Sequence, residues 1–242
     1  MYYIDIETVP AFKTFEDADE RTQQLFKKKM RAELLEWATR DLALAEFPGI
    51  PEDVKLRHLY GEKAGLFAEF NKIVCISLGV VIDKKAQLDG SVSPESIYIK
   101  SFAAENEKDS LIALAEALKT GYQMCAHFGK GFDYPVLCRK YVMRQIPMPG
   151  LLNISGLKPW EVPLHDTQDM WKFGDMRHSC SLDLLAHCFG LPSPKSEMDG
   201  SEVGHYYYNV PDGLKKIVEY CERDVKTLIN VHRVMNYKAP IL

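Results

Sequence analysis

The order of apolar and polar positions predicts strands near the start of the chain and helices interleaved with strands later. Residues 2–9 alternate polar and apolar side chains, as a strand with one buried face does, and Pro10 ends the run. Further runs rich in β-branched and apolar residues predict more strands. The segments that show a strand pattern are 2–9, 73–82, 96–102 and 122–127.

Helical spacing of apolar residues marks the longer segments between and after these strands. Thr14 is expected to cap the first helix, which runs to about Phe47 before a break at 48–51. Gly121 is expected to stop the second helix, and Ser181 to cap the fourth. The predicted helices are 14–47, 107–119, 132–144, 182–188 and 211–236.

This order of elements predicts an α/β fold with a mixed central sheet flanked by helices. The strands at 73–82 and 96–102 are expected to pair antiparallel around a charged turn at 83–85. We expect residues 1–242 to form a single domain. Residues from about 11 to 70 form a helical insertion between its first two strands.

Composition narrows the class of protein. The chain is 46% apolar, enough for a substantial core, yet no stretch approaches the ~18 consecutive apolar residues of a membrane span. The first residues carry acids and no basic region, unlike a signal peptide. Six scattered cysteines without a Cys-x-x-Cys pair indicate reduced thiols and a cytoplasmic location, with no membrane partner. The net charge of −4 gives no global basic field, although a nuclease that gathers carboxylates around cations can be acidic overall.

The first candidate for chemistry is the pair Asp5 and Glu7. Residues two apart in a strand project to the same face, so both carboxylates leave an otherwise apolar strand together. Burial of two like charges is costly unless a cation neutralises them. The alternative is an exposed edge strand that carries two solvated acids.

Two later segments supply further candidates. Tyr220 and Asp224 lie one helical turn apart and share a face beside the apolar stripe, where a phenol could position a water and a carboxylate could hold a metal. Their alternative is a chance pair at the edge of the core. Asp133, between Phe132 and Pro135, could be a third acidic ligand, or simply a helix N-cap.

Taken together, these segments resemble the three motifs of the DEDDy exonucleases, which include the proofreading domains of family-B DNA polymerases. The chain is most similar to the stand-alone bacterial family of predicted 3′→5′ exonucleases called polymerase-B-like, and the resemblance covers most of its length. The segments that fit the family pattern are Ile4–Pro10, His165-Asp166-Thr167, Ser181-Leu182-Asp183, Ser193-Pro194-Lys195, Asp199-Gly200-Ser201 and Tyr220–Val225.

The resemblance implies a ribonuclease H-like fold and a two-metal phosphodiester hydrolase that acts on single-stranded or frayed DNA 3′ ends. It implies that two divalent cations, Mg²⁺ or Mn²⁺, are bound by Asp5, Glu7, Asp133 and Asp224. Tyr220 would orient the attacking water. Two alternatives stay open: an exoribonuclease that uses the same site, and a non-catalytic nucleic-acid-binding module of the same fold.

Residues around the acidic motifs bear on substrate binding. Relatives of the polymerase type usually carry Asn five positions before the middle Asp, where this chain has Phe128. Phe128 could stack on a base, although a Phe after a strand is more often part of the core. Lys195 could contact the scissile phosphate, or simply be solvated. Asp166 is expected to be structural.

Overall fold

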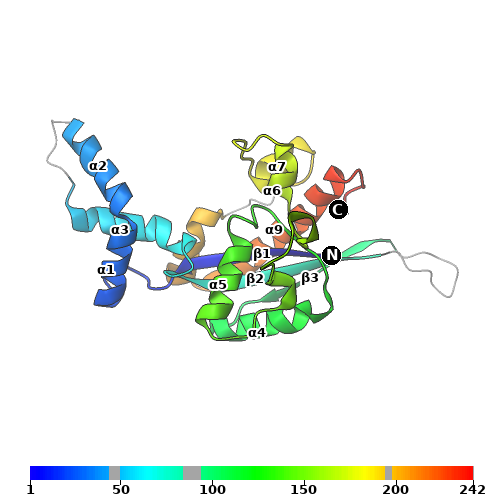
Figure 1. Ribbon diagram of the computed structural model, residues 1–242, viewed down its shortest axis with the longest axis horizontal. Coiled ribbons are helices and arrows are strands. Elements are labelled where there is room, and N and C mark those ends of the chain that lie inside the picture. The colour runs from blue at the N-terminus through cyan, green and yellow to red at the C-terminus, as the bar shows by residue number, and fades with distance from the viewer. Residues whose placement is uncertain (44–49, 84–93, 194–197, 242) are drawn as a thin grey trace.

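A mixed five-stranded sheet with the order β3-β2-β1-β4-β5 forms the centre of the protein. The structure of the protein is a computed structural model that describes residues 1–43, 50–83, 94–193 and 198–241 (Figure 1). The strands are β1 (Tyr2–Pro10), β2 (Asn71–Ile82), β3 (Ser96–Phe102), β4 (Met124–Ala126) and β5 (Leu164–Asp166). The predicted α/β fold with a mixed sheet is therefore confirmed.

The middle strand, β1, has a long neighbour on one side and a short one on the other. It pairs antiparallel with β2 from Tyr3 to Pro10, with a shift of register between Glu7 and Thr8. On the other side it pairs in parallel with β4 only at Tyr2 and Tyr3. Beyond Tyr3, this edge of β1 is therefore left for groups other than a strand.

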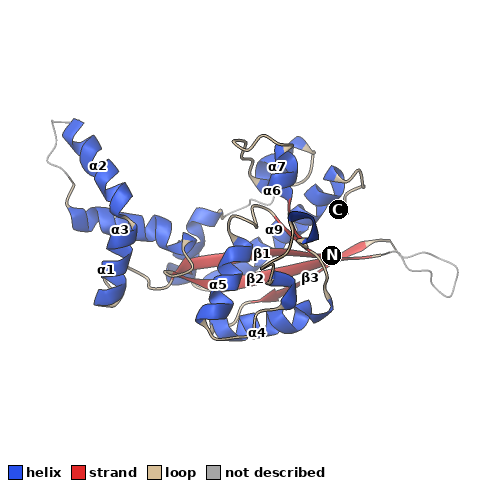
Figure 2. Ribbon diagram, viewed as in Figure 1, coloured by secondary structure: helices blue, strands red, loops and turns tan. Residues whose placement is uncertain are grey.

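Helices cover both faces of the sheet (Figures 1 and 2). The α-helices are α1 (Glu20–Lys29), α2 (Arg31–Ala43), α3 (Glu52–Lys63), α4 (Glu107–Ala117), α5 (Asp133–Met143), α6 (Thr167–Lys172), α7 (Leu182–Cys188), α8 (Val203–Asn209) and α9 (Gly213–Met235). Short 3₁₀ turns are Ala64–Leu66, Leu118–Thr120, Gly150–Leu152, Pro159–Glu161 and Gly200–Glu202. None of the helices in the described ranges is long and apolar enough to cross a membrane.

The alternation along β1 divides the core into two layers. Ile4 and Ile6 pack with α4 and α5 on one face, whereas Tyr3 and Val9 pack towards α9 on the other. On the α9 face, a Cβ added at Gly79 of β2 would lie 2.6 Å from a methyl carbon of Val225. Because glycine has no side chain, α9 can lie close against the sheet here. This close packing brings the polar face of α9 near β1.

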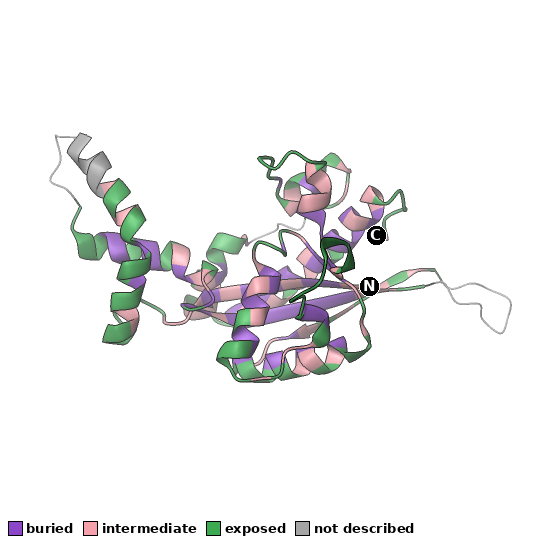
Figure 3. Ribbon diagram, in the orientation of Figure 1, coloured by how far each residue is buried: buried purple, intermediate pink, exposed green. Residues whose placement is uncertain are grey.

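The segment between β1 and β2 is helical, as predicted, and extends from one end of the sheet (Figure 1). Its helices α1 and α3 bury only their inner faces (Figure 3). These faces form a separate small core of Phe26, Met30, Leu56, Leu59, Tyr60, Ala64 and Phe70. Contacts to the strand fix its base: the Ala11 N–H donates to the Phe70 carbonyl (2.8 Å), and the Thr8 hydroxyl donates to the Gly65 carbonyl (2.6 Å).

The start of the first helix differs from the prediction. Thr14 caps no helix, because its hydroxyl donates to Asp17 (2.8 Å) in a loop. Asp19 is the N-cap instead, and it accepts from the Thr22 N–H (3.0 Å). The expected continuous helix is divided at Met30 into α1 and α2, and residues 44–47 of it lie outside the described residues.

Elsewhere the predicted elements agree with the structure to within a few residues, and four elements were missed. The strand 96–102 and the helix 182–188 have the predicted bounds, and the Ser181 hydroxyl accepts from the Leu184 N–H (3.2 Å). The missed elements are α3, which lies within the predicted helical insertion, and β5, α6 and α8. Helix α8 contains three successive tyrosines, a composition typical of strands, and packs against β1 with the Tyr208 hydroxyl donating to the Pro10 carbonyl (2.7 Å).

Candidate metal-binding and active site

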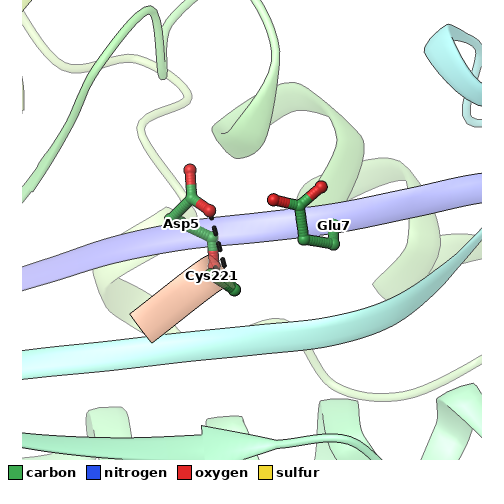
Figure 4. A group of neighbouring side chains, drawn as sticks. All are labelled: Asp5, Glu7 and Cys221. Carbon is green, nitrogen blue, oxygen red and sulfur yellow. Dashed lines mark hydrogen bonds between the residues drawn. The ribbon is translucent and has the colours of Figure 1, made fainter. Parts of the chain in front are cut away.

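Asp5 and Glu7 project together from the central strand of the sheet (Figure 4). Both lie on the face that packs towards α9, opposite Ser77 and Cys75 of β2. Glu7 is only 8% exposed, and Asp5 is half-buried. The alternative of two solvated acids on an edge strand is therefore wrong.

Helix α9 brings Tyr220, Cys221 and Asp224 to the same place. The buried Tyr220 phenol forms a side-chain hydrogen bond with Asp224. The Cys221 thiol lies 3.2 Å from Asp5 Oδ2 and 3.4 Å from the Asp5 carbonyl oxygen (Figure 4). One potential ligand atom from each of Asp5, Glu7 and Cys221 falls within 4.8 Å of the others.

Cys221 was not among the candidates from the sequence, because its position assigns it to the apolar stripe that borders Tyr220 and Asp224, and its contact with Asp5 was missed. Its fully buried side chain does belong to that stripe. Only its position directly after Tyr220 could have indicated that it borders the acidic group.

Asp133 lies beside Ile6, between Asp5 and Glu7 in the strand, but it is not among the residues whose ligand atoms fall within 4.8 Å of one another. It is the first residue of α5, and Phe132 occupies the N-cap position without a side-chain cap, so the N-cap interpretation of Asp133 is wrong. Its Oδ1 accepts a hydrogen bond from the Ile6 N–H (3.2 Å). This donor is available because β4 ends at Ala126. Asp133 is 4% exposed.

The four carboxylates act on one another electrostatically. Burial raises the pKa of Asp5 well above its usual value, and the charges of Glu7, Asp224 and Asp133 raise it further. Burial and the charge of Asp224 do the same for Glu7. Burial raises the pKa of Asp133 to about 7, although two backbone N–H groups oppose the shift. Without a cation, such a group holds protons at neutral pH.

Tyr220 stays a neutral phenol in these surroundings. Burial raises its pKa well above the usual value, and the charges of Asp224, Glu7 and Asp5 raise it further. A group with so high a pKa cannot serve as a base near neutral pH, but its hydroxyl can donate and accept hydrogen bonds.

Comparison with known families decides the superfamily. Residues 61–236 match the family described as the RNase_H superfamily. The chain belongs to the RNase H superfamily. Asp133, Tyr220 and Asp224 lie within the matched range, whereas Asp5 and Glu7 precede it, because β1 is separated from the rest of the sheet by the helical segment.

A solved structure with a similar fold is the family B DNA polymerase from the hyperthermophilic archaeon Pyrobaculum calidifontis. It shares 14% sequence identity with the chain, and the TM-score is 0.48. The similarity covers 94% of this chain and 23% of the polymerase chain, so the chain spans less than a quarter of the polymerase's length. No curated protein matches the chain.

Phe128 of this RNase H superfamily chain is not a core residue, which corrects the more frequent interpretation of a Phe after a strand. Its backbone is left-handed (φ 57°), and its side chain is 49% exposed. The ring covers Gly131, where an added Cβ would lie 2.4 Å from a ring carbon. The exposed ring, five residues before Asp133, leaves base stacking as a prediction. Lys195 lies outside the described residues.

Asp166 holds the turn between β4 and α5 in place. Its carboxylate accepts from the N–H groups of Phe128 (2.9 Å) and Lys130 (3.0 Å), and it also caps α6 through the Gln168 N–H (2.9 Å). The contacts to Phe128 and Lys130 span 38 and 36 residues of sequence, and all three contacts hold backbone in place. Asp166 therefore has a structural role, as predicted, and it holds the turn that leads to Asp133.

In the metal-free protein, replacement of Asp133 by Asn is expected to raise the free energy of unfolding relative to wild type, and to raise it more at pH 8 than at pH 5. The folded-state pKa of about 7 exceeds the ordinary value near 4, so the wild type loses stability as pH rises between these values. Asn keeps an acceptor for the Ile6 N–H but does not titrate, so the variant does not lose stability in this way as pH rises. The variant should gain about 2–3 kcal/mol relative to wild type between pH 5 and pH 8, at ~1.4 kcal/mol for each of the roughly two pH units over which only the folded wild type holds the proton.

Urea unfolding of both proteins in EDTA at pH 5, 6, 7 and 8 measures this difference. The comparison must be between variant and wild type, because burial also lowers the pKa of His127 and His232. The stability that these two histidines contribute is lost as pH falls, which is opposite to the effect of Asp133. A variant whose relative stability fell with rising pH would show that the pKa of Asp133 is not raised by its buried surroundings.

Proposed function

We propose that this protein is a metal-dependent 3′→5′ exonuclease that removes nucleoside 5′-monophosphates from single-stranded or frayed DNA ends. The observation that carries the proposal is the placement of Asp5 and Glu7 together on the central strand, with Asp133 hydrogen-bonded to Ile6 between them and Asp224 held by Tyr220 on α9. Fold membership adds support, since the RNase H superfamily is a superfamily of nucleases. Burial of like charges beside one another destabilises the folded protein unless a cation neutralises them.

The donor set fits hard divalent cations. Carboxylate oxygens suit Mg²⁺ or Mn²⁺, and two such ions would hold the scissile phosphate, activate the attacking water and stabilise the leaving oxygen. Cys221 does not change this preference. Burial raises the pKa of its thiol well above the usual value, and contacts with Cys75 and Asp5 raise it further. In our scheme the thiol stays protonated, donates to Asp5 and fixes the orientation of that carboxylate.

In the proposed reaction the side chains hold the cations and orient the attacking water. Asp5, Glu7, Asp133 and Asp224 hold the cations, and the sheet and helices fix their spacing. The neutral Tyr220 phenol is anchored by Asp224 and directs the attacking water at the phosphorus. The phosphorus–oxygen bond to the 3′ oxygen of the preceding nucleotide breaks as the bond to water forms. The products are a shortened strand and a nucleoside 5′-monophosphate.

Purified protein is expected to shorten 5′-labelled single-stranded DNA from its 3′ end with Mg²⁺ or Mn²⁺, and to leave it intact with EDTA. A 3′-labelled strand should release labelled mononucleotide from the first time point, and circular single-stranded DNA should resist. Electrophoresis and thin-layer chromatography measure both products. The inert control is protein prepared with Asp133→Asn, which keeps the acceptor for Ile6 and lacks the charge.

The same assay separates the remaining candidates. Faster shortening of a matched RNA strand would identify the exoribonuclease. Tight binding of either strand without hydrolysis under any metal condition would identify the non-catalytic module and overturn the proposed function. Internal cleavage of circular DNA would contradict exonuclease action.

A further inference from the structure

A cavity of about 990 Å³ begins at Glu7 and follows the last part of β1. Its floor is formed by Glu7, Thr8 and Pro10, so one end opens at the acidic group. The other end lies past Pro10, about 10 Å along the strand at ~3.3 Å per residue. We name this cavity the strand groove.

The two walls come from segments far apart in the sequence. One wall is built by the helical segment, with Lys13, Thr14 and residues 61–66, and the other by residues 200–209 with α8. Both are fixed to the floor: the Thr8 hydroxyl donates to the Gly65 carbonyl, and the Tyr208 hydroxyl donates to the Pro10 carbonyl. Figure 1 shows both segments at the same end of the sheet.

The groove is lined by lysine side chains, by glycines that expose only their backbone, and by aromatic rings. Lys13 and Lys63 both line the groove, and neither forms an ion pair with a carboxylate in the part of the chain described. Phe132 lies at the end near Asp133, and Tyr208 lies at the Pro10 end. Gly61 and Gly200 present backbone only, and a Cβ added at either would meet nothing within 4 Å.

Two carboxylates also belong to the lining, Glu7 and Glu62. Glu7 is one of the proposed cation ligands, so its charge is neutralised in the working site. Glu62 lies 3.3 Å from His58 one turn earlier in α3, on the solvent side of that helix. Lys13 and Lys63 are the lysines that can meet phosphate groups along the groove, and Glu62 is the carboxylate that opposes them there.

We infer that the strand groove binds the single-stranded segment of the substrate next to the end being cleaved. This inference rests on the proposed function and deepens it, because it assigns the helical segment a substrate-binding role. Cations that follow a backbone and rings that stack on bases are the means by which proteins hold single strands without regard to sequence. A groove closed on both sides excludes the second strand of a duplex.

Binding can be measured apart from hydrolysis by fluorescence anisotropy with a labelled single-stranded decathymidylate in Ca²⁺, with gels to confirm that the strand stays intact. The double variant Lys13→Glu/Lys63→Glu should weaken binding by about 10–100-fold. The slope of log affinity against log salt should fall by about 1.4, at ~0.7 per lost phosphate contact. The matched control is Lys28→Glu/Lys215→Glu, which has the same net charge but changes exposed lysines outside the groove.

A steric variant tests the same groove without a change of charge. Gly61→Leu places an aliphatic side chain in open space on an exposed helical position and should weaken binding about 10-fold, in the range of a lost stacking or phosphate contact. Val54→Leu, on the exposed surface of the same helix, is its control and should bind as wild type does. A blunt 10-base-pair duplex should bind the wild type more weakly than the single strand.

The outcomes separate this inference from the proposed function. Equal binding by the groove variants and their controls, in a wild type that hydrolyses DNA, overturns the groove and leaves the exonuclease standing. Groove-dependent binding in a protein that hydrolyses nothing with Mg²⁺ or Mn²⁺ supports the groove and overturns the exonuclease. Duplex binding as tight as single-strand binding also overturns the groove.

Discussion

Replacement of Asp5 by Asn is expected to lower the rate of DNA hydrolysis by at least about 10³-fold, the scale on which lost charge stabilisation acts at a reaction centre. Asp5 is close to the other three carboxylates, whose charges raise its pKa together with burial, and its ligand atom lies within 4.8 Å of that of Glu7. Asn keeps the shape of the side chain and an acceptor for the Cys221 thiol. The change therefore removes charge and little else.

Single-turnover assays with saturating Mg²⁺ measure this effect. The control is Asp109→Asn, which alters an exposed carboxylate in the first turn of α4 and should keep full activity. In EDTA at pH 8, Asp5→Asn should unfold at the same temperature as wild type or higher, because one repelling charge is gone. Retained hydrolysis in a folded Asp5→Asn protein would contradict the metal-ligand role.

Replacement of Tyr220 by Phe is expected to reduce turnover by about 10–10³-fold while metal affinity is kept. This is the range associated with a misplaced nucleophile or a lost catalytic hydrogen bond. The ring fills its buried place in both proteins, so only the hydroxyl and its bond to Asp224 are lost. Tyr122→Phe, at a residue that is 74% exposed, is the matched control.

The pH profile tells positioning from proton transfer. Wild-type turnover should show no limb controlled by the phenol, because burial and three carboxylates hold the pKa of Tyr220 far above the assay range. Tyr220→Phe should therefore lower the whole profile without a change of shape. A profile that changed shape in the variant would mean that the phenol titrates during the reaction, and full activity would mean that the hydroxyl has no part in it.

How far the sequence could predict the molecule depends on how local each interaction is. The bounds of β3 and α7 follow from residues within a few positions of one another, such as the Ser181 cap. The first helix was misplaced because Thr14 and Asp19 both have the chemistry of an N-cap. Packing of Phe26 and Tyr60 in the small core favours the later start. The three-residue strand β5 is too short to show any period, and only its pairing with β4 defines it.

The repeat of a single element is enough to predict that Asp5 and Glu7 share one face of a strand and that Tyr220 and Asp224 share one face of a helix. Packing between distant segments is needed to place β1 at the centre of the sheet, to end β4 early so that the Ile6 N–H donates to Asp133, and to bring Cys221 against Asp5. The strand groove likewise needs Lys13, Gly61 and Tyr208 together. Such contacts join residues far apart in the chain, and no local periodicity records which surfaces will meet.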